Sequence, residues 1–180
     1  LRERVEAALA GLVALDVDAG RARRIHENLA RLGLSAEVRV ADATDTAAWW
    51  DGRPFDRVLL DVPCSGTGVI RRHPDIKLLR RAGDIPRFAA RQRQLLAAGL
   101  EVLVPGGRLL YVTCSLLAAE NDELIRAFVA AEPRAEHCSQ SARLALPGVV
   151  PVRGPGPGYT LPGGVADADG FYYACLEKRA

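Results

Sequence analysis

The 180-residue sequence contains no methionine and few aromatic residues: two Trp, four Tyr and four Phe. The missing initiator methionine leads us to expect a piece of a longer protein. No apolar run approaches the roughly 20 residues that a membrane-spanning helix needs. Residues 1–4 are charged and lack the apolar stretch of a secretory signal. We therefore expect a cytoplasmic protein with no membrane partner.

The sequence also lacks any Cys-x-x-Cys pair, because its four cysteines lie far apart at Cys64, Cys114, Cys138 and Cys175. Its three histidines show no metal-ligand spacing. These absences argue against a zinc site and against a small disulfide scaffold. We expect reduced thiols and no metal. Cys138 and Cys175 match no motif, so we interpret them as small buried apolar residues.

The net charge is only +2, but it is unevenly distributed. Residues 71–93 contain eight basic and two acidic residues, a net of +6, so the remainder carries −4. A local basic patch on a nearly neutral domain is typical of a phosphate-binding face. A solvated arginine-rich helix is the alternative, and charge alone does not distinguish the two.

Apolar strand-like runs alternate with amphipathic helical segments along the whole chain. This order predicts one α/β domain over residues 1–180, with a mostly parallel sheet and right-handed crossovers. The last strand follows a long Pro- and Gly-rich loop, residues 146–164, and is expected to insert antiparallel. Residues 1–10 are expected to end a helix, and Trp49 and Trp50 to lie in a loop. The expected strands are residues 12–15, 36–40, 57–60, 108–112, 135–138 and 171–177, and the expected helices are 19–32, 85–103 and 118–131.

Acidic residues follow three successive strands, at Asp16, Asp42 and Asp61. A carboxylate just beyond a strand can accept hydrogen bonds from the ribose of a nucleoside cofactor. The acid after the next strand can reach the adenine amino group. The alternative is ordinary turn chemistry, in which Asp is common and Asp18 caps the helix that follows it.

Two of the cysteines follow apolar strand-like runs. Cys64 lies in Asp-Val-Pro-Cys-Ser-Gly-Thr-Gly, residues 61–68, and Cys114 lies in Thr-Cys-Ser, residues 113–115. Ligands bind beyond the carboxyl ends of strands in open α/β sheets, so both cysteines are expected to face one substrate. A thiolate is a strong nucleophile, and a second thiol can act as acid or base. Burial as small apolar residues is again the alternative.

Both cysteine motifs resemble those of the RNA cytosine-C5 methyltransferases that use S-adenosylmethionine. Further stretches narrow the resemblance to the bacterial group that methylates 16S ribosomal RNA, the RsmB or Sun/Fmu type. The similarity runs in order from about Leu12 to Glu177. The stretches are residues 68–77 (Gly-Val-Ile-Arg-Arg-His-Pro-Asp-Ile-Lys), Arg81 with residues 84–86 (Asp-Ile-Pro), residues 120–121 (Glu-Asn) and residues 169–174 (Asp-Gly-Phe-Tyr-Tyr-Ala).

The resemblance implies a Rossmann-like methyltransferase fold and a covalent mechanism. Cys114 corresponds to the nucleophile that adds to C6 of cytosine so that C5 can accept a methyl group, and Cys64 to the cysteine that assists product release. The other implied roles are ribose binding by Asp16, a position near adenine for Asp42, hydrogen bonding to cytosine by Asp61, and RNA contact by Arg71, Arg72 and His73.

Two parts of the family pattern are missing from this sequence. One is the first strand with its Gly-rich cofactor loop, which normally precedes the strand ending at Asp16. The other is the N-terminal RNA-binding region. We therefore expect a truncated sheet in which the strands ending at Asp16 and Asp61 lack their shared neighbour. We also expect a monomer that, as an isolated chain, binds cofactor weakly and is inactive.

Two other functions stay open at this point. In a DNA cytosine-C5 methyltransferase the Pro-Cys cysteine is the nucleophile, and the Thr-Cys-Ser motif at residues 113–115 argues against that assignment. A non-catalytic RNA-binding remnant would show salt-dependent RNA binding without any cofactor effect. A thiol hydrolase is disfavoured, because no motif places a histidine beside Cys114.

Overall fold

The computed structural model describes residues 11–138, 152–153, 156–164 and 168–180. The chain divides into two compact units, which meet in the sequence between Gly52 and Arg53. The helix expected over residues 1–10 lies outside the described residues. In the part of the chain that the structure describes, no helix is both long and apolar enough to span a bilayer.

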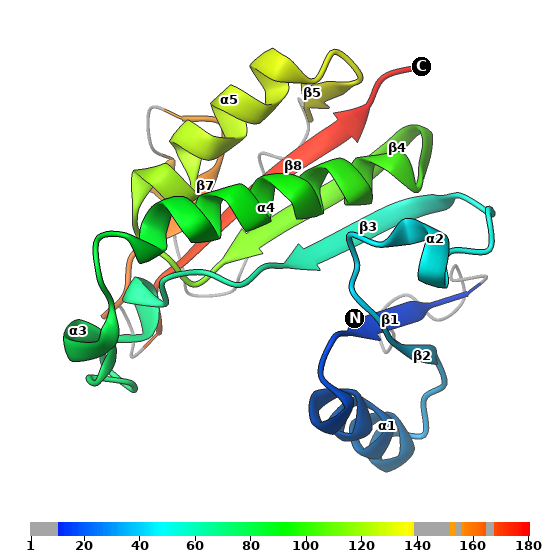
Figure 1. Cartoon of the computed structure of the whole chain (residues 1–180), viewed down its shortest axis with the longest axis horizontal. Helices are drawn as coiled ribbons and strands as arrows, with labels where there is room; N and C mark the ends of the chain where they lie inside the picture. Colours follow the sequence, from blue (N-terminus) through cyan, green and yellow to red (C-terminus); the bar gives the residue numbers. More distant parts are fainter. Residues whose placement is uncertain (1–10, 139–151, 154–155, 165–167) are drawn as a thin grey trace. The chain divides into compact units, whose positions relative to one another are not determined.

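The N-terminal unit contains two parallel strands joined through a helix (Figure 1). Val13 lies opposite Glu37 and Asp16 opposite Val40, so both strands end at the same edge. A short helix follows where only a loop was expected around Trp49. Its Trp49 indole donates to the Ala43 carbonyl at 3.3 Å, and this contact supports the extra turn. The elements are β1 (Val13–Asp16), α1 (Ala19–Leu32), β2 (Glu37–Val40) and α2 (Thr46–Trp49).

Helix α1 has the bounds predicted from the sequence, because local signals define both of its ends. The Asp18 carboxylate accepts from the Arg21 backbone N–H at 2.8 Å and caps the first turn. Gly33 adopts a left-handed φ of 64° and donates its backbone N–H to the Ala30 carbonyl. Glycine adopts this conformation without steric cost, so the helix ends there.

The C-terminal unit contains a six-stranded sheet in the order β3-β4-β8-β7-β6, with β5 also paired to β8. Strands β3 and β4 are parallel, whereas β8 runs antiparallel to β4, as predicted for the last strand. Figure 1 shows the long β8 arrow beside β4. The strands are β3 (Phe55–Asp61), β4 (Leu103–Thr113), β5 (Ala135–His137), β6 (Val152–Arg153), β7 (Tyr159–Leu161) and β8 (Phe171–Lys178), and the helices are η3 (Thr67–Val69), α3 (Ile76–Leu79), α4 (Asp84–Glu101), η4 (Ala118–Glu120) and α5 (Asp122–Ala131).

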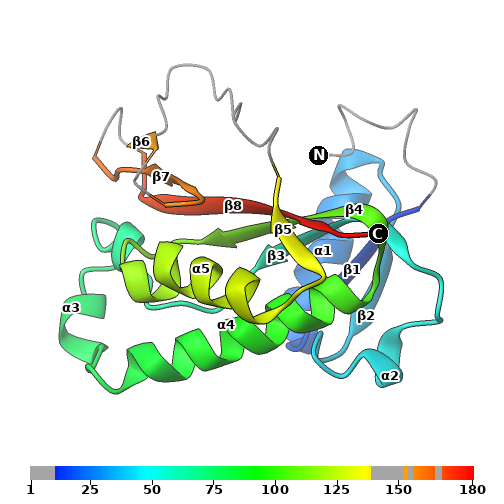
Figure 2. The same cartoon turned by 90° about the horizontal axis from the view of Figure 1, so that it is seen from above.

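Helices α4 and α5 lie against one face of this sheet (Figure 2). Leu96 and Leu100 of α4 are completely buried, as are Leu109 of β4 and Leu176 of β8. Burying apolar side chains of this size supplies most of the stabilisation of such a unit. This core holds β3, β4 and β8 together, and the loops that follow β3 and β4 are built on it.

Two other expectations about local structure were wrong. The helix expected over residues 118–131 is divided into η4 and α5 at Asn121, whose φ of −120° and ψ of −112° are not helical. The residues expected to form only a loop, 146–164, contain β6 and β7, which pair with each other. The Pro and Gly residues in this stretch are typical of loops. Strand β7 forms there nevertheless, because it pairs with the edge of β8.

Strands β1 and β3 belong to separate sheets among the described residues. Strand β3 is the first strand in the order of the larger sheet and pairs there with β4. The strands that end at Asp16 and Asp61 therefore share no neighbour in the described residues, as the missing first strand predicted.

Candidate active site

The structure brings Cys64 and Cys114 together, although 50 residues separate them in the sequence. Asp61 at the end of β3 is in register with Val112 near the end of β4. Because these strands are adjacent and parallel, the loops that follow them begin side by side. The Cys64 Sγ and Cys114 Sγ atoms lie 3.3 Å apart, and both residues are half-buried. Two thiols beyond the ends of two adjacent strands thus lie next to each other, and their common substrate stays a prediction.

The glycines of the first cysteine motif have identifiable structural roles. Gly66 has a left-handed φ of 76°. Gly68 donates its backbone N–H to the Cys114 carbonyl at 2.8 Å and accepts from the Gly170 N–H at 2.8 Å. A Cβ at position 68 would overlap the Gly170 and Cys114 carbonyls. Only glycine allows the backbones of these three segments to approach so closely.

The pKa values of the two thiols are shifted in opposite directions. The hydrogen bond from Cys64 lowers the pKa of Cys114 below its ordinary value. The same interaction, together with burial, raises the pKa of Cys64. Of the two thiols, Cys114 is therefore the one that ionises more readily. A thiolate is the nucleophilic form of cysteine.

Asp61 is the last residue of β3, three residues before Cys64. Partial burial raises the pKa of its carboxyl group. Its negative charge in turn raises the pKa of Cys114 and, with burial, that of Tyr173. The Asp61 carboxylate therefore lies within electrostatic reach of the Cys114 sulfur.

A fully buried polar cluster lies behind the two cysteines. Ser65 and Ser115 each directly follow a cysteine, and both have no solvent exposure. The same is true of Gln92 on α4 and of Glu120 in η4. Glu120 was expected only as part of a motif, and no role was expected for Gln92. A signal for Gln92 existed, because it lies three and four residues before Leu95 and Leu96 on the apolar face of its helix.

Asn121 holds the second cysteine loop from one side. Its Oδ1 accepts from the Thr113 hydroxyl at 2.7 Å, and its Nδ2 donates to the Ser115 carbonyl at 2.8 Å. Thr113 and Ser115 flank Cys114. Buried side chains thus hold the backbone on both sides of Cys114.

The residues expected to contact RNA lie in the exposed turn after η3. Arg72 forms an ion pair with Asp169, whose side chain is largely buried. Arg72 therefore also ties this turn to the Asp-Gly-Phe motif before β8. Arg71 and His73 are exposed, and the structure leaves their RNA contacts as a prediction.

Arginines also surround a hollow of about 350 Å³ beside the first cysteine loop. The Arg80 guanidinium lies 5.0 Å from the centre of the Phe88 ring and donates from Nε to the Ser65 carbonyl at 2.7 Å. Four of the lining residues occur at a helical spacing on α4, a signal that was present in the sequence. The hollow is lined by Pro63, Arg80, Asp84, Arg87, Phe88 and Arg91.

In the N-terminal unit, the carboxylates of Asp16 and Asp42 follow two adjacent parallel strands. Asp16 accepts from the Arg21 Nε at 2.9 Å, and this bond is the main cause of its lowered pKa. Asp42 accepts from the Thr44 backbone N–H at 2.9 Å. Arg21 is well exposed, and an exposed ion pair is weak enough for ribose hydroxyls to replace it. Both carboxylates therefore fit the nucleoside part of the expected cofactor.

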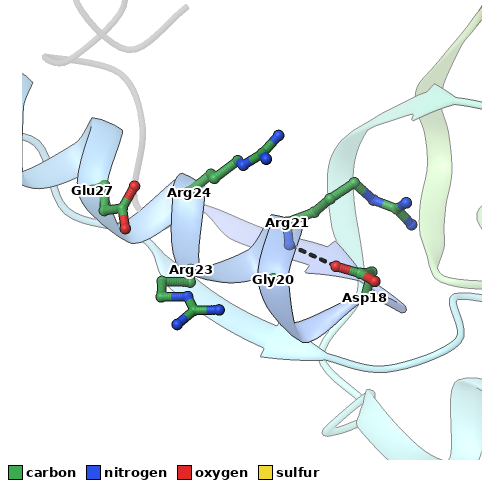
Figure 3. A pocket seen from close by; sticks show the side chains of 6 residues that line it. All are labelled: Asp18, Gly20, Arg21, Arg23, Arg24 and Glu27. Atoms are coloured by element: carbon green, nitrogen blue, oxygen red, sulfur yellow. Dashed lines mark hydrogen bonds between the residues drawn. The ribbon is translucent and has the colours of Figure 1, made fainter.

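A second hollow, of about 420 Å³, lies over the start of α1. Its arginine side chains point in different directions rather than toward one point (Figure 3). Neither Asp16 nor Asp42 lines it. Among the described residues, no group of three His, Cys, Asp or Glu side chains is arranged to hold a metal ion.

Comparison with known proteins finds a family model and relatives that match almost the whole chain. The family model described as 16S rRNA methyltransferase RsmB/F matches residues 3–177. Ribosomal RNA small subunit methyltransferase B of Pseudomonas putida is 51% identical over 175 residues, which cover 97% of this chain and 38% of that protein. The protein of the same name from Vibrio vulnificus is 47% identical over 169 residues, which cover 94% and 37%. The chain thus spans less than two fifths of the length of these relatives.

Two solved structures with a similar fold also match almost the whole chain. The structure of NSun6 from Pyrococcus horikoshii with SFG has a TM-score of 0.78 at 27% identity, covering 94% of this chain and 42% of that one. A methyltransferase homologue from the same organism has a TM-score of 0.72 at 31% identity, covering 93% and 53%.

Proposed function

Because the chain belongs to the RsmB/F family of 16S rRNA methyltransferases, whose members depend on S-adenosylmethionine, we propose that it carries the catalytic site for methylation of cytosine C5 in 16S ribosomal RNA. The single observation that supports this most strongly is the pair of thiols 3.3 Å apart beyond two adjacent parallel strands. Because the proposed substrate is bacterial ribosomal RNA, the proposed reaction takes place in the cytoplasm.

The proposed reaction begins at Cys114. Its thiolate adds to C6 of the cytosine, which makes C5 nucleophilic. Bound S-adenosylmethionine supplies a methyl group on a sulfonium leaving group. The bond from C5 to the methyl carbon forms while the methyl–sulfur bond breaks, and C5 keeps its proton until the next step. Asp61, at the end of β3, is placed to hydrogen-bond the cytosine ring or its exocyclic amine.

Cys64 is proposed to complete the cycle. While Cys114 is bonded to carbon, it no longer raises the pKa of Cys64, although burial still does. In the proposed step Cys64 gives its proton to water. The Cys64 thiolate then takes the proton from C5. The C5–C6 double bond re-forms, the C6–sulfur bond breaks, and Cys114 leaves as a thiolate. The site returns to its starting state with the proton on Cys64.

Binding roles are proposed for residues outside this pair. Asp16 would hold the ribose hydroxyls of the cofactor and Asp42 the adenine amino group. The exposed turn with Arg71, Arg72 and His73 would contact RNA. The arginine-lined hollow beside Pro63 supports the same assignment, because guanidinium groups bind phosphates bidentately and also stack on bases.

Two substitutions test the proposed function directly in the full-length protein. Cys114→Ala should abolish methyl transfer, because no group is left to activate C5. Cys64→Ala should instead accumulate a covalent protein–RNA adduct, seen as a band that survives denaturing electrophoresis. The reverse pattern would support a DNA-type mechanism. RNA binding without methyl transfer or any cofactor effect would support a non-catalytic role.

We propose in addition that the 180 residues alone bind cofactor weakly and are inactive. The support is that β3 pairs only with β4 among the described residues, and unpaired backbone groups in a sheet are costly. Isothermal titration with S-adenosylmethionine and a methyl-transfer assay would compare the 180 residues with the longer protein. Equal activity of the two would contradict this proposal.

A further inference from the structure

We propose that Glu120 is a positioning residue, which couples the two cysteine loops so that the Cys64 thiol stays opposite Cys114; this rests on the proposed function. The Glu120 Oε1 atom accepts from the Ser65 backbone N–H at 2.9 Å. Its Oε2 atom accepts from the Ser115 hydroxyl at 2.6 Å. One carboxylate therefore binds the residue that follows each cysteine.

The burial of this carboxylate shows that its hydrogen bonds matter. Glu120, Ser65 and Ser115 have no solvent exposure. A buried carboxylate is costly unless strong donors satisfy it. Here the donors are a backbone amide, a hydroxyl and the Gln92 side-chain amide at 3.1 Å. Moving either loop away would leave buried oxygen atoms without these donors.

Other contacts hold the carboxylate itself in place. The Gln92 Nε2 atom donates both to Glu120 and to the Pro63 carbonyl, the latter at 2.9 Å. The Tyr111 hydroxyl donates to the Glu120 backbone carbonyl at 2.8 Å. Helix α4 and strand β4 therefore orient Glu120, and Gln92 also binds the first cysteine loop at Pro63. The loops are positioned against a support that belongs to the core.

Other links between the loops do not involve Glu120. They are the backbone hydrogen bond from Gly68 to the Cys114 carbonyl, the contact of the Ser65 and Ser115 hydroxyls at 3.0 Å, and the Thr67 hydroxyl, which accepts from the Leu116 N–H at 2.9 Å. Losing the Glu120 carboxylate should therefore leave the loops joined but release the Ser65 backbone N–H, next to Cys64. The expected defect is a displaced Cys64 thiol rather than an unfolded site. The step that uses Cys64, release of the methylated base, should suffer most.

The first experiment measures thiol proximity without reference to catalysis. In a Cys138→Ser/Cys175→Ser background of the full-length protein, diamide oxidises Cys64 and Cys114 to a disulfide, and mass spectrometry follows its rate. Glu120→Ala should slow this rate about tenfold or more, since a displacement of about 1 Å has effects of this order or larger. Glu120→Gln should stay close to the parent, because its amide oxygen replaces Oε1 and Ser115 can turn its proton toward Ser65.

The control is Asn121→Ala. Asn121 is also buried, but it binds only the loop that contains Cys114. It should slow disulfide formation clearly less than Glu120→Ala. Equal effects of the two, or a Glu120→Gln rate as low as that of Glu120→Ala, would overturn the positioning role. Should Glu120→Ala fail to fold, Ser115→Ala removes one arm of the coupling and should slow the rate in the same direction; an unchanged rate would also overturn it.

The second experiment separates the two chemical steps. Single-turnover assays with RNA measure adduct formation and release in each variant. Glu120→Ala should slow release more than adduct formation, so that adduct accumulates as in Cys64→Ala, and Glu120→Gln should restore release. Equal slowing of both steps would contradict coupling through Cys64. If Cys64→Ala forms no adduct, the proposed function fails, whereas the disulfide rates still decide the role of Glu120.

Discussion

The molecule contains two pairs of neighbouring cysteines, and their surroundings differ completely. Cys64 and Cys114 lie in loops beyond the ends of β3 and β4. Cys138 and Cys175 lie at the β5–β8 pairing, where the Cys138 N–H donates to the Cys175 carbonyl at 3.1 Å. Burial and the neighbouring thiol raise the pKa of Cys175, whereas the hydrogen bond from Cys64 lowers that of Cys114.

This comparison shows that closeness of two thiols does not by itself make a reactive site. In the sheet, burial disfavours the thiolate of Cys175. In the loops, one thiol donates to the other, and a buried polar cluster holds the loops in place. Strand ends allow this because their backbone groups and side chains are not all used by the sheet.

The largest expected difference between the pairs is in alkylation. Iodoacetamide at pH 7 should modify Cys114 about 10²-fold faster than Cys175, because the rate follows the thiolate fraction, which changes tenfold per pKa unit. Peptide mapping by mass spectrometry over a time course measures both rates. Similar rates would show that the pKa values of Cys114 and Cys175 do not differ as the structure indicates.

The second prediction concerns the backbone that supports the loop pair. Gly68→Ala should destabilise the protein by about 1–3 kcal/mol, because the new Cβ overlaps the Gly170 carbonyl. Gly83→Ala is the matched control, since nothing lies within 4 Å of its Cβ position, and should change stability by less than about 0.5 kcal/mol. Thermal and denaturant unfolding measure both; a stable Gly68→Ala variant would refute the close approach.

The third prediction tests how Cys64 acts on Cys114. The hydrogen bond lowers the pKa of Cys114, so its loss in Cys64→Ala should move the alkylation midpoint to higher pH. A shift of about one pH unit is expected, since a hydrogen bond to a charged group contributes roughly 1.5–3 kcal/mol and one unit equals about 1.4 kcal/mol. Cys138→Ala should leave the midpoint of Cys114 unchanged. A downward shift in Cys64→Ala would reverse the assigned roles.

The smallest effect is expected at the sheet pair. Arg108 and Glu177 form a partly exposed ion pair at 3.3 Å beside Cys138. Such pairs contribute at most about 1 kcal/mol. Glu177→Gln should therefore lower the unfolding free energy by less than that, and added salt should reduce the difference. A larger loss of unfolding free energy would mean that the Arg108–Glu177 ion pair stabilises the sheet more than its partial exposure suggests.

Local signals account for the parts of the fold that the sequence predicted well. Helix α1 has its predicted bounds because Asp18 and Gly33 define its ends within a few residues. The antiparallel β8 was expected from the long loop before it. The break at Asn121 was not predicted, because its cause lies in contacts with Thr113 and Ser115 on another segment.

The candidate site shows the same division. The sequence predicted the positions of Cys64 and Cys114 beyond apolar strands, and it also predicted the acidic residues at strand ends. The ion pair of Arg72 with Asp169 and the reach of Glu120 to both loops were not. These contacts join residues that are far apart in the chain, where spacing and propensity carry no information.

The sequence by itself determined the alternation of strands and helices, the bounds of α1 and which side chains follow the strands, because caps, turns and periodicity act over a few residues. Only the tertiary structure decided that two sulfurs 50 residues apart would lie 3.3 Å from each other and that one buried carboxylate would serve both loops. The physical reason is that such contacts depend on the order β3-β4-β8 and on the packed core beneath it.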